Sequence, residues 1–224
     1  MMEELNLLQQ LIAVDTDCML AINGLHNSWA DGFMWGYTKV AVWIPFYVVL
    51  VVFLGKNMNL KTTLWALLCV GITILLCDQV TSHLIRPMVQ RLRPANLDNP
   101  VSEWVHIVNG YRGGRYSFPS AHASNTFGLA FLLMWMFRNR LLTTVMLLWA
   151  FLNCYSRIYL GVHYPGDILA GMMVGFLVAT FAYWLFRRFS KEDPARYPIL
   201  ALKLPTAAWL ISVGCLCIYA FVML

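Results

Sequence analysis

The chain has 224 residues, of which 60% are hydrophobic and 12% charged, with a mean hydropathy of +0.63 and a formal net charge of +5. Soluble domains are about 45–50% apolar and about 25% charged, so this composition excludes an ordinary soluble protein and indicates a polytopic membrane protein. The positive charge is gathered in motifs and short loops, not in a basic stripe, so we expect no nucleic-acid partner. The length fits a single membrane-embedded domain, 1–224.

The first segment, residues 1–30, is typical of a helix that lies on the membrane surface. Leu8 and Ile12 can share one apolar side, but Asp15 and Asp17 interrupt the apolar run before it is long enough to cross a bilayer. No basic region precedes the apolar residues, so we expect no signal peptide.

Six further segments are apolar over about 20 residues, which is the length needed to cross a bilayer. They are 33–54, 61–84, 120–137, 141–160, 166–187 and 205–224. The fold class predicted is therefore all-α, a bundle of six transmembrane helices plus an N-terminal interfacial helix. The connection 85–118 between the second and third segments is long, and long loops in compact domains are often functional, so we interpret it as an active-site loop.

Three short polar clusters stand out from the apolar sequence. They are Arg86-x6-Arg93-Pro94, Pro119-Ser120-Ala121-His122 and Ser156-Arg157-x5-His163-x3-Asp167. Together they supply arginines, hydroxyls, two histidines and a carboxylate, all near the ends of predicted membrane spans. Such a set favours a site that binds a phosphoryl group and attacks it with an imidazole, and its position favours a lipid as the owner of the phosphate.

The third cluster contains a histidine and an acid four residues apart. Pro165 restricts Tyr164 to extended backbone, so His163 is expected just before a helix and Asp167 in its first turn. Asp167 can then accept a hydrogen bond from one ring nitrogen of His163 and leave the other as a nucleophile. Taken alone, the pair is more simply interpreted as a histidine and an acid that make ordinary hydrogen bonds in a loop.

The second cluster begins a predicted helix. The first backbone N–H groups of a helix have no partners within it, and such a terminus binds anions. Ser120 adds a hydroxyl donor, the amide of Ala121 is a further donor, and His122 can protonate a leaving oxygen as a general acid. The plainer alternative is a capped helix start without catalytic function.

Arginines are the third component. Arg86, Arg93 and Arg157 offer planar, charged forks that match phosphate oxygens. Any one of them could instead anchor lipid headgroups at a helix end. Arg112 and Arg115, in the loop 85–118, are candidates to bind a second phosphate or a headgroup.

In order and spacing the three clusters resemble the type 2 phosphatidic acid phosphatase family of integral-membrane lipid phosphatases, over roughly residues 5–187. The family pattern is Lys-x6-Arg-Pro, Pro-Ser-Gly-His and Ser-Arg-x5-His-x3-Asp. Arg86 replaces the lysine and keeps its charge, and Ala121 replaces the glycine and keeps its N–H. Both departures retain the functional groups.

The resemblance implies a role for each matched residue. His163 would be the nucleophile that forms a phosphohistidine, Asp167 would orient it, and His122 would protonate the leaving group. The phosphate would be held by Arg86, Arg93, Ser120, Ala121 and Arg157. No cofactor or metal is implied, and the sequence shows no cluster with metal-ligand spacing.

The positions of the basic residues predict which side the site faces. Six crossings place both termini and all three clusters on one side. The other side carries basic residues outside the motifs, which are Lys56, Lys61, Arg138, Arg140, Arg187, Arg188, Lys191, Arg196 and Lys203. Positively charged loops favour the cytoplasm, so the site is expected to face the periplasm or exterior, in a bacterial inner membrane.

The function predicted is hydrolysis of a lipid phosphomonoester or diphosphate. Undecaprenyl diphosphate, phosphatidylglycerophosphate, phosphatidate and lipid A all remain candidate substrates, and the oligomeric state is open. The alternatives are a non-catalytic membrane transport or binding protein and a vanadate-dependent haloperoxidase. Asp78, an acid inside the second predicted span, is expected to have a structural role beneath the site.

Overall fold

The structure, a computed structural model, describes residues 6–193 and 203–222, and within these ranges it is helical with no β-strand. Its α-helices are α1 (Leu7–Asn23), α2 (Ser28–Tyr37), α3 (Ile44–Asn57), α4 (Leu60–Asp78), α5 (Arg86–Val89), α6 (Ala121–Phe137), α7 (Arg140–Tyr159), α8 (Pro165–Ser190) and α9 (Lys203–Val222). Short helical turns of other types are η1 (Val40–Trp43), the π-helical η2 (Gln79–Ile85) and η3 (Pro100–Trp104). This confirms the all-α fold class.

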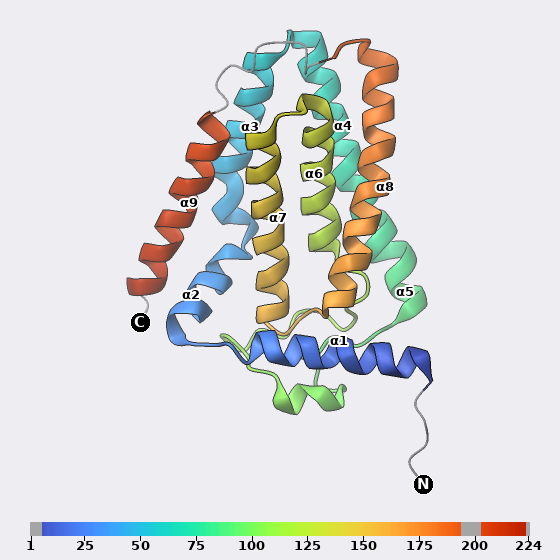
Figure 1. Ribbon diagram of the computed structural model, residues 1–224, viewed down its shortest axis with the longest axis vertical. Helices are drawn as coiled ribbons and strands as arrows, with labels where there is room; N and C mark the ends of the chain where they lie inside the picture. Colours follow the sequence, from blue (N-terminus) through green and yellow to red (C-terminus); the bar gives the residue numbers. More distant parts are fainter. Residues whose placement is uncertain (1–5, 194–202, 223–224) are drawn as a thin grey trace.

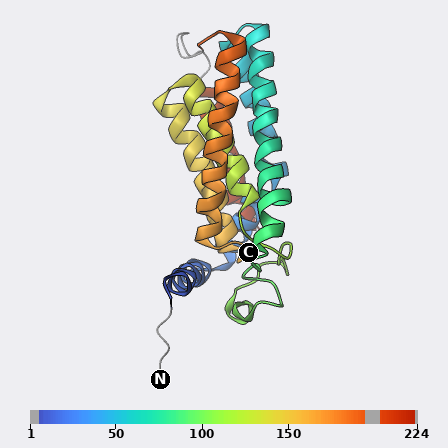
Figure 2. The same cartoon turned by 90° about the vertical axis from the view of Figure 1, so that its right-hand side faces the viewer.

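The long helices form an elongated bundle that is closed at one end by α1. Helices α3, α4, α6, α7, α8 and α9 run along the long axis, and α1 lies across the lower end (Figure 1). Turned by 90°, the view shows α1 nearly end-on, beside the loop that contains η3 (Figure 2). The apolar side chains in the first half of α1 are exposed, Leu7 and Leu8 among them, whereas Met19 near its end is buried. This arrangement is the one predicted for a helix on the membrane surface.

Helix α6 is the central element, packed against α4, α7 and α8. Its close approach to α8 depends on glycines. A Cβ on Gly171 would lie 2.4 Å from the carbonyl oxygen of Ser120, and a Cβ on Gly175 would lie 2.6 Å from that of Ser124. Small residues allow backbones to approach in this way in membrane bundles. The contact brings the start of α6 beside the start of α8, where two of the predicted clusters lie.

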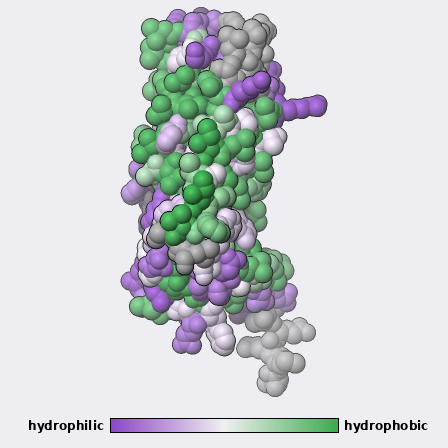
Figure 3. All heavy atoms as spheres, turned by 90° about the vertical axis from the view of Figure 1, so that its left-hand side faces the viewer, coloured by the Kyte–Doolittle hydropathy of each residue, from purple (hydrophilic) through white to green (hydrophobic). Residues whose placement is uncertain are grey.

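Five helical spans in the described residues are long and apolar enough to cross a membrane: 40–57, 60–89, 140–159, 165–190 and 203–222. The surface of the middle of the bundle is largely apolar, with hydrophilic residues gathered toward both ends (Figure 3). Helix α6, with 17 residues, is shorter than these five and is enclosed by its neighbours. The count of six crossings therefore remains a prediction.

The element boundaries differ from the predictions in two places. The first span was predicted from residue 33, but the helix breaks at Thr38 and Lys39, and α3 starts again with Pro45 in its first turn. The second span continues past residue 84 through η2 and α5 to Val89. Residues 1–5 of the predicted interfacial segment, 223–224 of the last span and Arg196 lie outside the described residues.

Candidate active site

The three polar clusters meet at the end of the bundle that α1 crosses. The loop between α5 and α6, the start of α6, the end of α7 and the start of α8 all lie there (Figure 1). The chain turns between α7 and α8 at Gly161, which has a φ of +66°. Glycine is the residue that adopts this backbone conformation without strain. The turn places His163 directly before α8.

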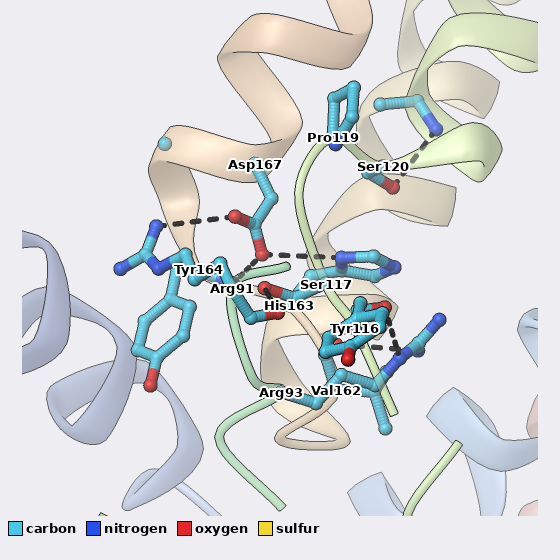
Figure 4. Close-up of polar contacts among 12 residues, drawn as sticks. Arg91, Arg93, Tyr116, Ser117, Pro119, Ser120, Val162, His163, Tyr164 and Asp167 are labelled. Carbon is cyan, nitrogen blue, oxygen red and sulfur yellow. Dashed lines mark hydrogen bonds and ion pairs between the residues drawn. The ribbon is translucent and has the colours of Figure 1, made fainter. Parts of the chain in front are cut away.

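His163 and Asp167 form a buried pair. The Nδ1 atom of His163 lies 3.3 Å from Oδ2 of Asp167, and the exposed fractions of the two residues are 1% and 0% (Figure 4). The same carboxylate oxygen accepts a hydrogen bond of 2.9 Å from the backbone N–H of Tyr164. These contacts fix the orientation of the ring and leave Nε2 of His163 as the nitrogen that can act as a nucleophile.

The other oxygen of Asp167 is held by a residue that no motif indicated. Nη1 of Arg91 lies 3.2 Å from Oδ1 of Asp167 and 2.7 Å from Oδ2 of Asp15. Asp15, from α1, also accepts a hydrogen bond of 2.7 Å from the N–H of Gly166. The guanidinium lies 3.7 Å from the centre of the Tyr164 ring. No local pattern could indicate this contact, because Asp15 and Arg91 are 76 residues apart.

The start of α6 faces the same region. Ser120 is fully buried as the N-cap, its Oγ accepting from the N–H of Ala123 at 3.3 Å. Its own N–H donates to the carbonyl oxygen of Asp167 at 3.0 Å, and this bond joins α6 to α8. Ala121 and His122 occupy the first turn, and the peptide bond before Pro119 is cis. The predicted position of His122 at a helix start is confirmed.

Three arginines are anchored around this pair by protein oxygens. Arg86 donates from Nη2 to the carbonyl of Pro119 at 3.0 Å. Arg93 donates from Nε to the carbonyl of Tyr116 at 3.1 Å (Figure 4). Arg157, on α7, donates to the hydroxyl of Thr38 at 2.6 Å.

Two of these guanidinium groups retain free donors. The Nε atoms of Arg86 and Arg157 are buried and have no hydrogen-bond partner among the residues that the structure describes. Charged donors buried without partners are costly unless a ligand pairs with them. The anchoring bonds fix the positions of the forks, and the unpaired nitrogens are suited to the oxygens of an anion.

The electrostatics of the site favour an anion and a neutral imidazole. Burial lowers the pKa of His163 well below its usual range, and the charges of Arg93, Arg157 and Arg86 lower it further. Burial, with repulsion from Arg157 and Arg86, also lowers the pKa of Arg93 to about 10. The cations therefore oppose each other, and a bound phosphate relieves that repulsion.

Tyr111 also interacts with the charges of these arginines. Burial tends to raise the pKa of its hydroxyl, but the charge and hydrogen bond of Arg157 and the charge of Arg93 outweigh this effect and lower the pKa. Its hydroxyl accepts from Nη2 of Arg157 at 3.0 Å. Tyr111 and Thr38 thus orient Arg157, although neither belongs to a motif.

The other predicted residues contact groups outside this pair. Arg112 donates to the carbonyl of Ala95 at 2.8 Å and shapes its own loop. Arg115 is exposed, 3.6 Å from the carboxylate of Asp98. Asp78 accepts a hydrogen bond of 3.0 Å from the hydroxyl of Ser82, within the helix that leads to Arg86. The described residues contain no group of three His, Cys, Asp or Glu that could hold a metal ion.

Comparison with known proteins gives concordant results. Residues 62–191 match the PAP2 superfamily. The chain is 43% identical to the lipid A 4'-phosphatase of Bacteroides thetaiotaomicron, over 85% of this chain and 83% of that protein. It is 32% identical to the undecaprenyl-diphosphatase BcrC of Bacillus subtilis, over 76% of this chain and 81% of that protein. The crystal structure of Aquifex aeolicus LpxE shares the fold, with a TM-score of 0.55 at 23% identity, over 74% of this chain and 92% of that chain.

Proposed function

Because the chain belongs to the PAP2 superfamily and is an integral-membrane lipid phosphatase, we propose that it hydrolyses a phosphate monoester of lipid A. The 43% identity to a lipid A 4'-phosphatase over most of both chains supports this substrate. We also propose that residues 1–224 form one phosphatase domain, in which α1 and the loop between α5 and α6 complete the site.

The mechanism follows from the arrangement of His163. Nδ1 is held by Asp167, so Nε2 attacks phosphorus and forms a phosphohistidine while the bond to the lipid oxygen breaks. His122 gives its proton to the departing lipid oxygen. In the second step water attacks the phosphohistidine, His122 takes a proton from that water, and phosphate leaves His163 in its original form.

The cations act on the charge that develops during transfer. Phosphoryl transfer spreads negative charge over three equatorial oxygens, and positioned cations stabilise that charge. Arg86, Arg93 and Arg157 are fixed by protein oxygens and so need little reorganisation when phosphate binds. Ser120 and the amide of Ala121 complete the proposed phosphate site at the start of α6.

The observation that carries this proposal is the buried His163–Asp167 pair, with its Nδ1 to Oδ2 distance of 3.3 Å, among three anchored arginines. Burial and these cations lower the pKa of His163, and the lowered pKa keeps the imidazole neutral and nucleophilic near pH 7.

The side of the membrane is a further part of the proposal. Basic residues outside the site gather at the end of the bundle opposite α1, among them Lys56, Arg140 and Arg187. The positive-inside rule then supports an inner-membrane enzyme whose site faces the periplasm.

A second candidate substrate is undecaprenyl diphosphate. The 32% identity to an undecaprenyl-diphosphatase over most of this chain favours it. In that case Arg112 or Arg115, in the loop between α5 and α6, would contact the second phosphate. Replacing either arginine would then impair hydrolysis of the diphosphate more than hydrolysis of a monophosphate.

The deciding experiment measures phosphate release by the purified protein from lipid A, undecaprenyl diphosphate, phosphatidylglycerophosphate and phosphatidate. Each lipid is tested with and without EDTA, and with the variant His163→Ala. A preference for lipid A that survives EDTA and is lost in the variant is expected. A preference for undecaprenyl diphosphate would replace the first candidate by the second, and turnover by His163→Ala would exclude His163 as the nucleophile.

A further inference from the structure

A mainly apolar cavity of about 390 Å³ lies inside the bundle and reaches the candidate active site. Helices α3, α4, α6 and α7 supply most of its walls. His122 and Thr38 line one end, and Leu133 lines it deeper along α6. Because a helix rises 1.5 Å per residue, Leu133 lies roughly 16 Å beyond His122. The cavity is therefore elongated, and it extends from the proposed general acid toward the membrane interior.

One wall of the cavity is also part of the outer surface of the bundle. Val51 on α3 and Ile74 on α4 line the cavity, and their exposed fractions are 47% and 37%. Both residues belong to helices that are apolar enough to cross a membrane, so this surface faces lipid tails. The side of the cavity between α3 and α4 is therefore the side from which a hydrocarbon chain in the bilayer would enter without crossing water.

The cavity wall also contains polar groups whose hydrogen-bonding capacity is unmet. The Oδ1 atom of Asn125 and the Nε1 atom of Trp149 are buried, and neither has a hydrogen-bond partner among the described residues. Asn125 follows His122 by three residues on α6, roughly 4.5 Å along the helix. Buried polar groups without partners are rare in proteins, and each one calls for an explanation.

We propose that this cavity binds an acyl chain of the substrate lipid, and that the carboxamide of Asn125 hydrogen-bonds to a hydroxyl or amide group on that chain. This inference rests on the proposed function, since it requires the phosphate of the same lipid to lie at His163. A chain that leaves the phosphate site past His122 meets Asn125 within one helical turn. Trp149 offers a donor deeper in the cavity, on α7.

The polar groups select among lipid classes. A polyisoprenoid chain is pure hydrocarbon, so it would leave Asn125 unpaired in an apolar environment, and that is unfavourable. An acyl chain with a hydroxyl or an amide linkage satisfies Asn125 while its hydrocarbon fills the rest of the cavity. Sites built to pair with a substrate hydroxyl or N–H discriminate strongly against analogues that lack it. The proposed substrate class is therefore a phosphorylated lipid with hydroxylated or amide-linked acyl chains.

The test compares kcat/KM for lipid A, whose acyl chains carry hydroxyl and amide groups, with that for phosphatidate, whose ester-linked chains have none. The small substrate p-nitrophenyl phosphate, which has no chain, reports on the phosphate site itself. We expect Asn125→Leu to reduce the ratio of kcat/KM for lipid A over phosphatidate about tenfold or more. The matched control is Thr180→Leu, which removes a hydroxyl from the exposed face of α8 and should leave that ratio unchanged. An unaltered ratio in Asn125→Leu overturns the role of Asn125.

A second variant tests the cavity independently of Asn125. Leu133→Trp fills the deep end, so it should lower kcat/KM for long-chain phosphatidate several-fold more than for short-chain phosphatidate. Equal effects on both chain lengths overturn the cavity as a chain-binding site. If the wild-type protein hydrolyses p-nitrophenyl phosphate but neither variant changes its kcat/KM ratio, this inference fails and the proposed chemistry stands. If it hydrolyses none of the substrates, the proposed function fails as well.

Discussion

Nη1 of Arg91 lies 3.2 Å from Oδ1 of Asp167, the carboxylate oxygen that does not face His163. The same nitrogen lies 2.7 Å from Asp15 of α1. Asp167 is fully buried, and a positive charge this close stabilises the ionised form of a buried carboxylate. Arg91 is therefore placed to keep the carboxylate ionised and oriented toward the histidine.

Replacing Arg91 should impair the chemical step more than substrate binding. We expect Arg91→Met to lower kcat roughly 10–100-fold with a smaller change in KM, because Asp167 loses its charge partner and its fixed orientation. Arg91→Lys, which keeps the charge, should recover part of the loss. Steady-state kinetics with p-nitrophenyl phosphate measure both variants.

The matched control for Arg91 is Arg140→Met, at the opposite end of the bundle, which should retain wild-type kinetics. A positioning role also predicts a shift in the pH dependence of kcat in Arg91→Lys. A pH profile identical to wild type, or a change confined to KM, would contradict the assignment.

The two histidines should differ in how their loss depends on the leaving group. His163→Ala removes the proposed nucleophile, so activity should fall at least about 1,000-fold on every substrate. In His122→Ala the first turnover should be slow on lipid phosphates but close to wild type on p-nitrophenyl phosphate, whose leaving group needs no proton, while steady-state turnover slows on both because His122 is also the proposed base for water. Equal first-turnover losses on the two substrates would argue against His122 as the general acid. Quenching the His122→Ala reaction in alkaline detergent should also detect a phosphoenzyme that is stable to base and is lost on treatment with acid.

The pH profile should reflect the cations around His163. Burial and the arginines lower the pKa of His163, so the acid limb of kcat/KM should lie below about pH 6.5, the usual histidine value. Arg93→Gln removes one of these cations, and although activity falls, the acid limb should move to higher pH. An acid limb that stays in place would show that Arg93 does not act on His163.

The lowered pKa of His163 should also make the folded protein less stable at acid pH. A histidine that is neutral in the folded protein takes up a proton on unfolding once the pH is below its unfolded pKa of about 6.5. The free energy of unfolding is therefore unaffected by His163 above about pH 6.5 and decreases as the pH falls below that value. Thermal unfolding of the protein in detergent should therefore show a melting temperature that falls below pH 6.5. His163→Gln, which does not titrate, should show a smaller fall. Equal pH dependence in both proteins would contradict the assignment.

The contact of α6 with α8 should not tolerate added side-chain atoms. Gly171→Ala places a Cβ near 2.4 Å from the carbonyl of Ser120, so we expect destabilisation of about 1–3 kcal/mol. The matched control is Gly214→Ala on α9, where no atom lies within 4 Å of the added methyl and a small gain in stability is expected. Denaturation in detergent compares the two, and equal behaviour would contradict the close approach of the helices.

The local geometry of the candidate site was predictable from the sequence because its helix starts and its histidine–carboxylate contact lie in local patterns. The spacing of His163, Pro165 and Asp167 determines both the helix start and the histidine–carboxylate contact, and Ser120 is the expected N-cap of α6. Hydropathy likewise predicted most of the spans to within a few residues.

The residues that orient the reacting groups were not predictable in this way. Asp15 contacts Arg91, which is 76 residues away in the sequence, and Thr38 contacts Arg157, which is 119 residues away. Periodicity carries no information on contacts of this range, so Asp15 and Thr38 were identified only in the fold. The break between α2 and α3 was missed for a different reason: it is closed by a local contact, in which Trp43 donates to the carbonyl of Tyr37 six residues earlier, and the hydropathy of the segment does not reveal it.

The support that α1 gives to Asp167 limits how the protein can be divided. The region that matches the PAP2 superfamily, residues 62–191, contains every motif but neither Asp15 nor Thr38. A fragment cut to that region would carry all the reacting groups and lack the partners that fix Arg91 and Arg157. Motif content is thus a poor guide to the smallest active unit. Transplanting the three motifs into another helical bundle would transfer their side chains without the contacts that hold those side chains in place.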